Sequence, residues 1–274
     1  MGMNMVVYQI VNEYKRLEEV EAITLAGSGA SGRKDNYSDI DIDIIVSKKI
    51  APEKRKAITK KVSDVMEINN DFWGDGDEFI LRNSNVQVDI AYFEYDWLKD
   101  GLEKVLHDNI ACTGYTTCFW HNVKNTIIVY DKDGRFTELQ NKCNIKYPEK
   151  LKMNIIDKNY PILRNAFSSY YHQVEKAINR KDLVSINHRV SAFLASYFDI
   201  IFAINEMPHP GEKKLVDIVE HTCNRKPINF KENIIKLLDS ISKADTDILD
   251  NMNLIVDYLD VLLDEIANEE EFKN

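Results

Sequence analysis

The sequence lacks an apolar run long enough to cross a bilayer, and its first ten residues lack the basic start and small-residue cleavage site of a signal peptide. These absences predict a cytoplasmic protein without a membrane partner. Cysteine is scarce, and the cysteines show no CxxC or zinc-type spacing: they are Cys112, Cys118, Cys143 and Cys223. We therefore expect small buried thiols in a reducing compartment, not a disulfide framework or a zinc site.

Basic residues are outnumbered by acidic ones, with 35 Lys and Arg against 45 Asp and Glu and a net charge of −10. A tight, sequence-independent grip on nucleic acid relies on Lys and Arg that neutralise phosphates. The charge balance therefore argues against nucleic acid as a partner and suits a cationic small molecule better. The 274 residues, 44% of them hydrophobic, are enough for a sizeable core. The oligomeric state stays open.

Three glycines within six residues follow a short apolar strand that we expect at residues 23–26. They stand in the run Gly27-Ser28-Gly29-Ala30-Ser31-Gly32. Glycine lets the backbone turn sharply and approach a ligand closely, so that successive amides can point at phosphate oxygens. This run predicts a phosphate site.

A second expected strand, residues 38–46, carries aspartates at alternate positions. Asp39, Asp41 and Asp43 alternate with isoleucines, so the isoleucines should face a core while the aspartates share the other face. At a rise of roughly 3.3 Å per residue, the Cα atoms of Asp39 and Asp41 lie about 6.6 Å apart, and their carboxylates could converge on one hard cation. The simpler alternative is an edge strand with one solvated face.

A single acid, Asp89, stands in another β-rich run at residues 85–93. A lone aspartate in a buried strand is costly without a partner, which predicts a metal ion or a hydrogen-bond donor beside it. The alternative is a strand-end aspartate that faces water.

The order of these features resembles the signature of the DNA polymerase β-like nucleotidyltransferase superfamily. That signature is a strand, a Gly-Ser pair, a loop, and then hydrophobic-Asp-hydrophobic-Asp in a second strand; here ten residues separate Ser28 from Asp39. The family also needs a third carboxylate on a later strand, for which Asp89 is the candidate. The pair in the second strand could instead be Asp41 and Asp43.

The resemblance implies a fold and an activity. The expected fold is an α/β nucleotidyltransferase domain, a mixed sheet with flanking helices, over residues 1–147, followed by an all-α helical bundle over residues 148–274. This layout is similar to the aminoglycoside and lincosamide nucleotidyltransferases. It implies transfer of a nucleoside monophosphate, usually from ATP, to a hydroxyl of a small acceptor, with two Mg²⁺ ions and release of pyrophosphate. An aminoglycoside-like antibiotic is one candidate acceptor.

The resemblance also assigns roles to residues. It makes Asp39, Asp41 and Asp89 both the catalytic residues and the metal ligands, and it makes Gly27, Ser28, Arg33 and Ser38 the nucleotide-binding residues. Close relatives often read Gly-Ser-x-Ala-Arg-Gly, whereas Ser31 stands at the position of that arginine, and Arg33 would have to replace it. The alternatives are a non-catalytic or toxin-antitoxin type regulatory module, and an enzyme that adenylylates a protein.

Local patterns predict further details. We expect a helix from Pro52 to about Met66 with its lysines and arginine on the solvated face, and a helix capped by Asp96. The acidic, glycine-rich residues 70–78 are typical of a hairpin connection, or of a loop that offers Trp73 or Glu78 to the site. Four or five strands are expected in the first half, and helices only from Pro148 onward.

Overall fold

The computed structural model describes residues 2–26 and 39–271, which form two compact units. The first unit comprises the described residues up to His107 together with Phe119–Ile145, and the second comprises Asp108–Cys118 with the described residues from Lys146 onward. Residues 108–118 thus belong with the second unit, although they precede the boundary predicted after residue 147, which remains a prediction. No described helix is long and apolar enough to span a bilayer.

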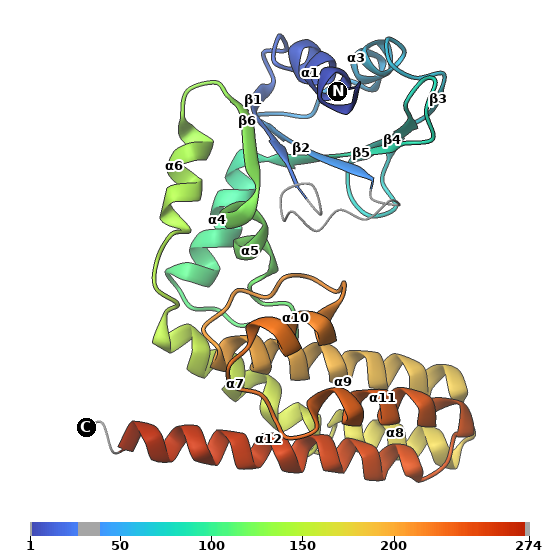
Figure 1. Ribbon diagram of the computed structural model, residues 1–274, viewed down its shortest axis with the longest axis vertical. Coiled ribbons are helices and arrows are strands. Elements are labelled where there is room, and N and C mark those ends of the chain that lie inside the picture. The colour runs from blue at the N-terminus through green and yellow to red at the C-terminus, as the bar shows by residue number, and fades with distance from the viewer. Residues whose placement is uncertain (1, 27–38, 272–274) are drawn as a thin grey trace. The chain divides into compact units, whose positions relative to one another are not determined.

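The first unit is built on a mixed six-stranded sheet of order β3-β4-β5-β2-β1-β6 (Figure 1). The central pair, β2 and β5, is parallel, and the other neighbouring strands are antiparallel. In chain order the strands are β1 (Val20–Leu25), β2 (Ile40–Val46), β3 (Val65–Asn70), β4 (Gly76–Ile80), β5 (Gln87–Glu94) and β6 (Ile127–Asp131).

Helices α1 (Gly2–Tyr14) and α3 (Pro52–Thr59) cover one face of this sheet (Figure 1). Ile40, Ile42 and Ile44 of β2 face these helices, and Ile42 and Ile44 are completely buried. Because successive side chains of a strand point to opposite faces, Asp41 and Asp43 face the other way, where they are only partly buried. The predicted alternation is therefore confirmed.

The remaining helices of the first unit follow its last strands. They are α4 (Tyr95–Leu106), α5 (Cys118–Asn125), which begins at the last residue of the 108–118 segment, and α6 (Arg135–Lys142).

In the described residues of the second unit, all regular elements are helices, as predicted. Its core surrounds the long helix α9, from which Phe193 and Ile200 are fully buried. The helices are α7 (Glu149–Leu163), α8 (Tyr170–Asn179), α9 (Leu183–Ile204), α10 (Leu215–Thr222), α11 (Phe230–Ser240), the short 3₁₀ helix η1 (Ile241–Lys243) and α12 (Asp247–Glu271). The predicted fold class, an α/β nucleotidyltransferase-type sheet followed by helices, is confirmed.

Three local predictions were wrong. Helix α3 ends at Thr59 and does not reach Met66, because Ser63 takes the chain into β3: its Oγ accepts a hydrogen bond from the Val65 N–H (3.1 Å). Asp96 does not cap α4, since Glu94 occupies the N-cap position. The described sheet has six strands where four or five were expected, because β3 was not predicted, and its first two residues fall at the end of the predicted helix.

Candidate functional site

The acidic side chains of three neighbouring strands meet on the face of the sheet that α1 and α3 leave uncovered. In the strand register Asp41 of β2 lies opposite Asp89 of β5, and Asp89 lies opposite Glu78 of β4. Neighbouring strands are about 4.8 Å apart, so the three residues stand in a row across the sheet. We call Asp41, Asp89 and Glu78 the acid row.

The acid row lines a pocket of about 750 Å³ that is formed within the first unit. Of the described residues around this pocket, seven are acidic and none is Lys, Arg or His. The acidic residues are Asp41, Asp43, Asp75, Asp77, Glu78, Asp89 and Glu94. Such a concentration of negative charge favours a cation, whether a metal ion or a charged group of a ligand.

The crowding of carboxylates changes their proton affinity. Burial, together with the charge of Asp41, raises the pKa of Asp43 to about 7. Burial also raises the pKa of Glu78, and the charges of Asp89 and Glu67 raise it further. Burial is the main cause of both shifts, and the neighbouring carboxylates act in the same direction.

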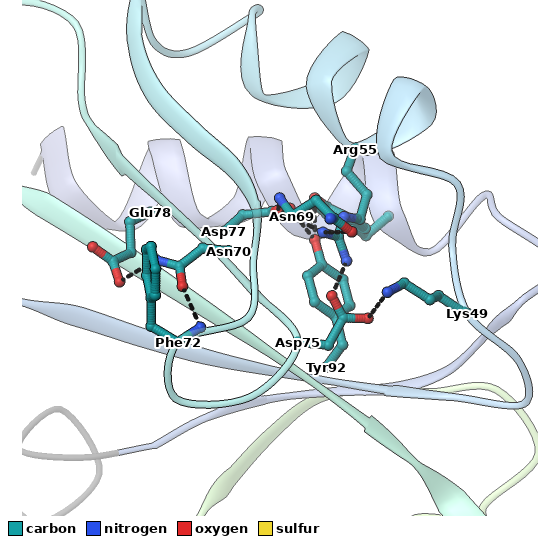
Figure 2. A network of polar contacts seen from close by, with 10 residues as sticks. Lys49, Arg55, Asn69, Asn70, Phe72, Asp75, Asp77, Glu78 and Tyr92 are labelled. Atoms are coloured by element: carbon teal, nitrogen blue, oxygen red, sulfur yellow. Dashed lines mark hydrogen bonds and ion pairs between the residues drawn. The ribbon is translucent and has the colours of Figure 1, made fainter.

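Two amides hold the acid row in place. The Gln87 side chain donates a hydrogen bond from Nε2 to Oδ1 of Asp89 (2.8 Å). The Asn70 side chain donates from Nδ2 to Oε1 of Glu78 (3.0 Å), and its own Oδ1 accepts from the Phe72 N–H (3.0 Å; Figure 2). Glu78 is thereby tied to the connection between β3 and β4, which forms part of the pocket wall.

A buried arginine secures the same connection (Figure 2). Arg55 of α3 is completely buried and contacts Asp75 through Nη1 (2.7 Å) and Asp77 through Nη2 (3.0 Å). Its guanidinium carbon lies 4.4 Å from the ring centroid of Tyr92. The prediction that this arginine lies on the solvated face was wrong. Its spacing of three residues from the buried Ile58 places it on the inner face of α3 and could have predicted its burial.

Hydrogen bonds extend this cluster to neighbouring elements. The Tyr92 hydroxyl donates to Oδ2 of Asp77 (2.6 Å) and lies 2.7 Å from the Tyr14 hydroxyl, while the Asn69 N–H donates to Oδ1 of Asp77 (2.8 Å). The cluster therefore joins the β3–β4 connection to β5, α1 and α3. It explains how residues 70–78, predicted to form a hairpin connection, hold a defined position beside the pocket.

The structure brings some of the predicted site residues together. Asp41 and Asp89 are neighbours, Asp39 is exposed directly before β2, and Asp43 lies one register step further, opposite Ala91. The choice between the pairs Asp39 with Asp41 and Asp41 with Asp43 therefore stays open. The predicted phosphate-binding residues lie outside the residues that the structure describes: they are Gly27, Ser28, Arg33 and Ser38.

The donor chemistry of the acid row fits a hard divalent cation. Asp41 and Asp89 present carboxylate oxygens from adjacent register positions, and such oxygens are the ligands that Mg²⁺ takes. Over residues 2–26 and 39–271, however, no three His, Cys, Asp or Glu side chains are grouped closely enough to hold a metal ion.

Comparison with solved structures finds similar chains of low sequence identity. A nucleotidyltransferase-like protein from Exiguobacterium sibiricum 255-15 is 12% identical, with 96% of this chain and 75% of that chain covered and a TM-score of 0.44. The spectinomycin adenyltransferase AAD(9) from Enterococcus faecialis is 12% identical, with coverages of 92% and 99% and a TM-score of 0.32. The STING-associated CdnE c-di-GMP synthase from Capnocytophaga granulosa is 13% identical, with coverages of 97% and 81% and a TM-score of 0.30.

Comparison with protein families is more specific. No curated protein matches the chain. Residues 118–214 match a family described as a domain of unknown function (DUF4037). Residues 8–74, which run from within α1 through β3, match the family described as "Polymerase beta, Nucleotidyltransferase". The matched segment contains β2, the strand that carries Asp41 and Asp43, and this part of the first unit is therefore similar to polymerase β-like nucleotidyltransferases.

Proposed function

We propose that this protein transfers a nucleoside monophosphate from a nucleoside triphosphate, with ATP as the first candidate, to a hydroxyl of a small acceptor. The acceptor oxygen forms a bond to the α-phosphorus, the bond from that phosphorus to the bridging oxygen breaks, and pyrophosphate leaves. The observation that carries the proposal is the position of Asp41 beside Asp89, in register on the open face of a nucleotidyltransferase sheet.

The acidic residues have distinct roles in this proposal. Asp39, Asp41 and Asp89 would hold two Mg²⁺ ions, which shield the phosphate charge and lower the pKa of the attacking hydroxyl when they are bound. Asp89 would complete the second metal site or accept the proton of that hydroxyl. Gly27, Ser28, Arg33 and Ser38 would bind the phosphates through their backbone amides and side chains.

The pocket supports a cationic, hydroxyl-bearing acceptor. Its volume of about 750 Å³ falls in the usual range for small-molecule sites, and its acidic lining attracts amines. An aminoglycoside-like compound, which combines hydroxyls with amines, is the first acceptor class to test.

Calorimetric titration of ATP with Mg²⁺ tests the nucleotide site. We expect the wild type to bind Mg²⁺ and ATP together, and an Asp41→Asn, Asp89→Asn double variant to lose metal-dependent binding, because it lacks both adjacent carboxylates. Asp100→Asn is a matched control, since Asp100 is an exposed aspartate of α4 outside the pocket lining. A variant that binds Mg²⁺ and ATP as the wild type does would contradict the assignment.

Pyrophosphate release then tests the reaction. Hydroxyl-bearing amines are added with ATP and Mg²⁺, and release that depends on both the acceptor and Asp41 supports the transferase. Nucleotide binding without release for any small acceptor, but with labelling of a protein, would favour the protein-adenylylating alternative. Absence of nucleotide binding in the wild type would favour a non-catalytic regulatory module.

A further inference from the structure

Three aromatic side chains form one end of the acidic pocket. They are Phe93 near the end of β5, Trp97 in the first turn of α4 and Phe119 in the first turn of α5. The Phe93 and Trp97 rings are stacked with centroids 6.1 Å apart, and the Phe119 ring meets Trp97 edge-on at 5.2 Å. Trp97 is 55% exposed and Phe119 is 45% exposed. We call these three residues the aromatic platform.

The aromatic platform and the acid row lie at the two ends of one strand. Side chains of β5 alternate between faces, so Asp89, Ala91 and Phe93 share the pocket face. Phe93 lies four positions after Asp89, which corresponds to roughly 13 Å along the strand. A ligand that lies along β5 could therefore reach both the carboxylates and the aromatic rings.

Small residues form the surface of the sheet between the acid row and the aromatic platform. Ala91 lies in register with Gly76 of β4. A Cβ atom at Gly76 would come within 3.1 Å of the Ile90 carbonyl oxygen, closer than side chains normally allow. The small side chain of Ala91 and the absence of one at Gly76 leave room above the sheet for a bound group.

We propose that the aromatic platform binds the nucleobase of the nucleoside triphosphate, while the phosphates lie toward the acid row. This inference rests on the proposed function and adds the position of the base to it. A sugar links base and phosphate in a nucleotide, and it would lie above Ala91. Every nucleobase presents a flat π-face, so stacking on Trp97 needs no particular hydrogen-bond pattern.

The chemistry of the two pocket ends favours the base over the acceptor at this place. A cationic acceptor is attracted most strongly by carboxylates, which are concentrated around Asp41, Asp43 and Glu78. A neutral, flat base gains little from those carboxylates but buries the exposed faces of Trp97 and Phe119. The nucleobase is thus expected at the aromatic platform and the cationic acceptor at the carboxylates.

Calorimetry with two ligands tests the proposal on the full chain. The ligands are ATP and inorganic tripolyphosphate, each with Mg²⁺, because tripolyphosphate offers the phosphates without a base. We expect Trp97→Leu to weaken ATP binding about ten-fold and to leave tripolyphosphate binding unchanged, as stacking on a base is lost. Trp97→Phe keeps an aromatic face and should restore most of the ATP affinity. Phe72→Leu is the control, because Phe72 is an exposed aromatic outside the pocket lining.

Phe119→Leu removes a second ring and should act in the same direction, so that a folding defect in one variant does not decide the result. Equal weakening of both ligands, or no weakening of ATP, would overturn the role of the platform while the phosphate site stands. Failure of the wild type to bind either ligand would overturn the proposed function and, with it, this inference.

Discussion

The two units bury charge in different ways. In the first, Arg55 is enclosed with the carboxylates of Asp75 and Asp77, so opposite charges compensate each other. In the second, Asp199 of α9 is 1% exposed and is hydrogen-bonded by neutral donors: the Thr116 N–H at 3.1 Å, the Thr116 Oγ1 at 2.6 Å and the Asn159 Nδ2 at 3.5 Å.

The difference has a physical consequence. Burial raises the pKa of Asp199 to about 6, and the hydrogen bonds from Thr116 only partly offset that effect. Neutral donors satisfy the geometry of a carboxylate without cancelling its charge, whereas an ion pair does both. We therefore expect the Arg55 cluster to be sensitive to removal of one of its partners, and the site of Asp199 to be sensitive to pH.

The largest effect is expected from Arg55→Met. Loss of the guanidinium leaves Asp77 buried without its cation, and such a change costs about 3–5 kcal/mol in free energy of unfolding. Urea denaturation of the variant and the wild type measures it. Arg82→Met is the matched control, because Arg82 pairs with the exposed Asp64, and its effect should be small. If both variants lost the same free energy of unfolding, burial of the ion pair would not explain the effect of Arg55→Met.

The pH dependence of Asp199 comes next. Its pKa of about 6 in the folded protein lies above the ordinary value of about 3.9 for an aspartate, so the folded state holds the proton more tightly. Protonated Asp199 therefore contributes its full share to the free energy of unfolding below pH 4. This contribution, on the order of 2–3 kcal/mol, is lost as the pH rises through about 6.

Asp199→Asn removes this titration. The free energy of unfolding of the wild type, relative to that of the variant, should fall between pH 4 and pH 7, as measured by urea denaturation across that range. A difference between the two proteins that stays constant with pH would mean that Asp199 titrates normally.

A smaller effect is expected from Thr116→Val, which removes the hydroxyl that donates to Asp199. A hydrogen bond to a buried charged group contributes about 1.5–3 kcal/mol, and its loss should lower stability at pH 7 more than at pH 4, where Asp199 is protonated. Thr137→Val is the control, because the Thr137 hydroxyl donates to Asp131 at the surface (2.6 Å). If Thr137→Val loses as much stability as Thr116→Val, burial does not strengthen the hydrogen bond from Thr116 to Asp199.

The smallest effect is expected from Asp75→Asn. Asp75 is one of two carboxylates on Arg55, but its side chain is 27% exposed, so the loss of its charge should cost about 1 kcal/mol. Thermal unfolding measures the change. Asp77→Asn is the variant for comparison, since the Asp77 carboxylate is fully buried. A larger loss of stability in Asp75→Asn than in Asp77→Asn would contradict the argument from burial.

Much of the first unit followed from local sequence patterns. The alternation of Ile and Asp in residues 40–44 predicts a strand with one buried and one polar face, and the structure confirms it. The region after Pro148 shows helical spacing and is helical. Such patterns depend on side-chain direction within one element, which the sequence states directly.

Other features depend on contacts between distant segments. The predicted end of the helix that begins at Pro52 was wrong: α3 ends at Thr59, and pairing with β4 makes Val65–Asn70 a strand. Burial of Arg55 depends on Asp75 and Asp77, some twenty residues further along the chain. Local propensity cannot predict the strand at Val65–Asn70 or the burial of Arg55, because both depend on partners that the fold brings together.

The sequence by itself determined the strand and helix character of the two units, the acidic positions Asp41 and Asp89, and the resemblance to polymerase β-like nucleotidyltransferases. Only the tertiary structure decided that Asp41 stands beside Asp89, that Glu78 extends the row, and that Trp97 and Phe119 share the same pocket. The physical reason is that strand register and helix placement follow from burying a common core, which is a property of the whole unit and not of any one segment.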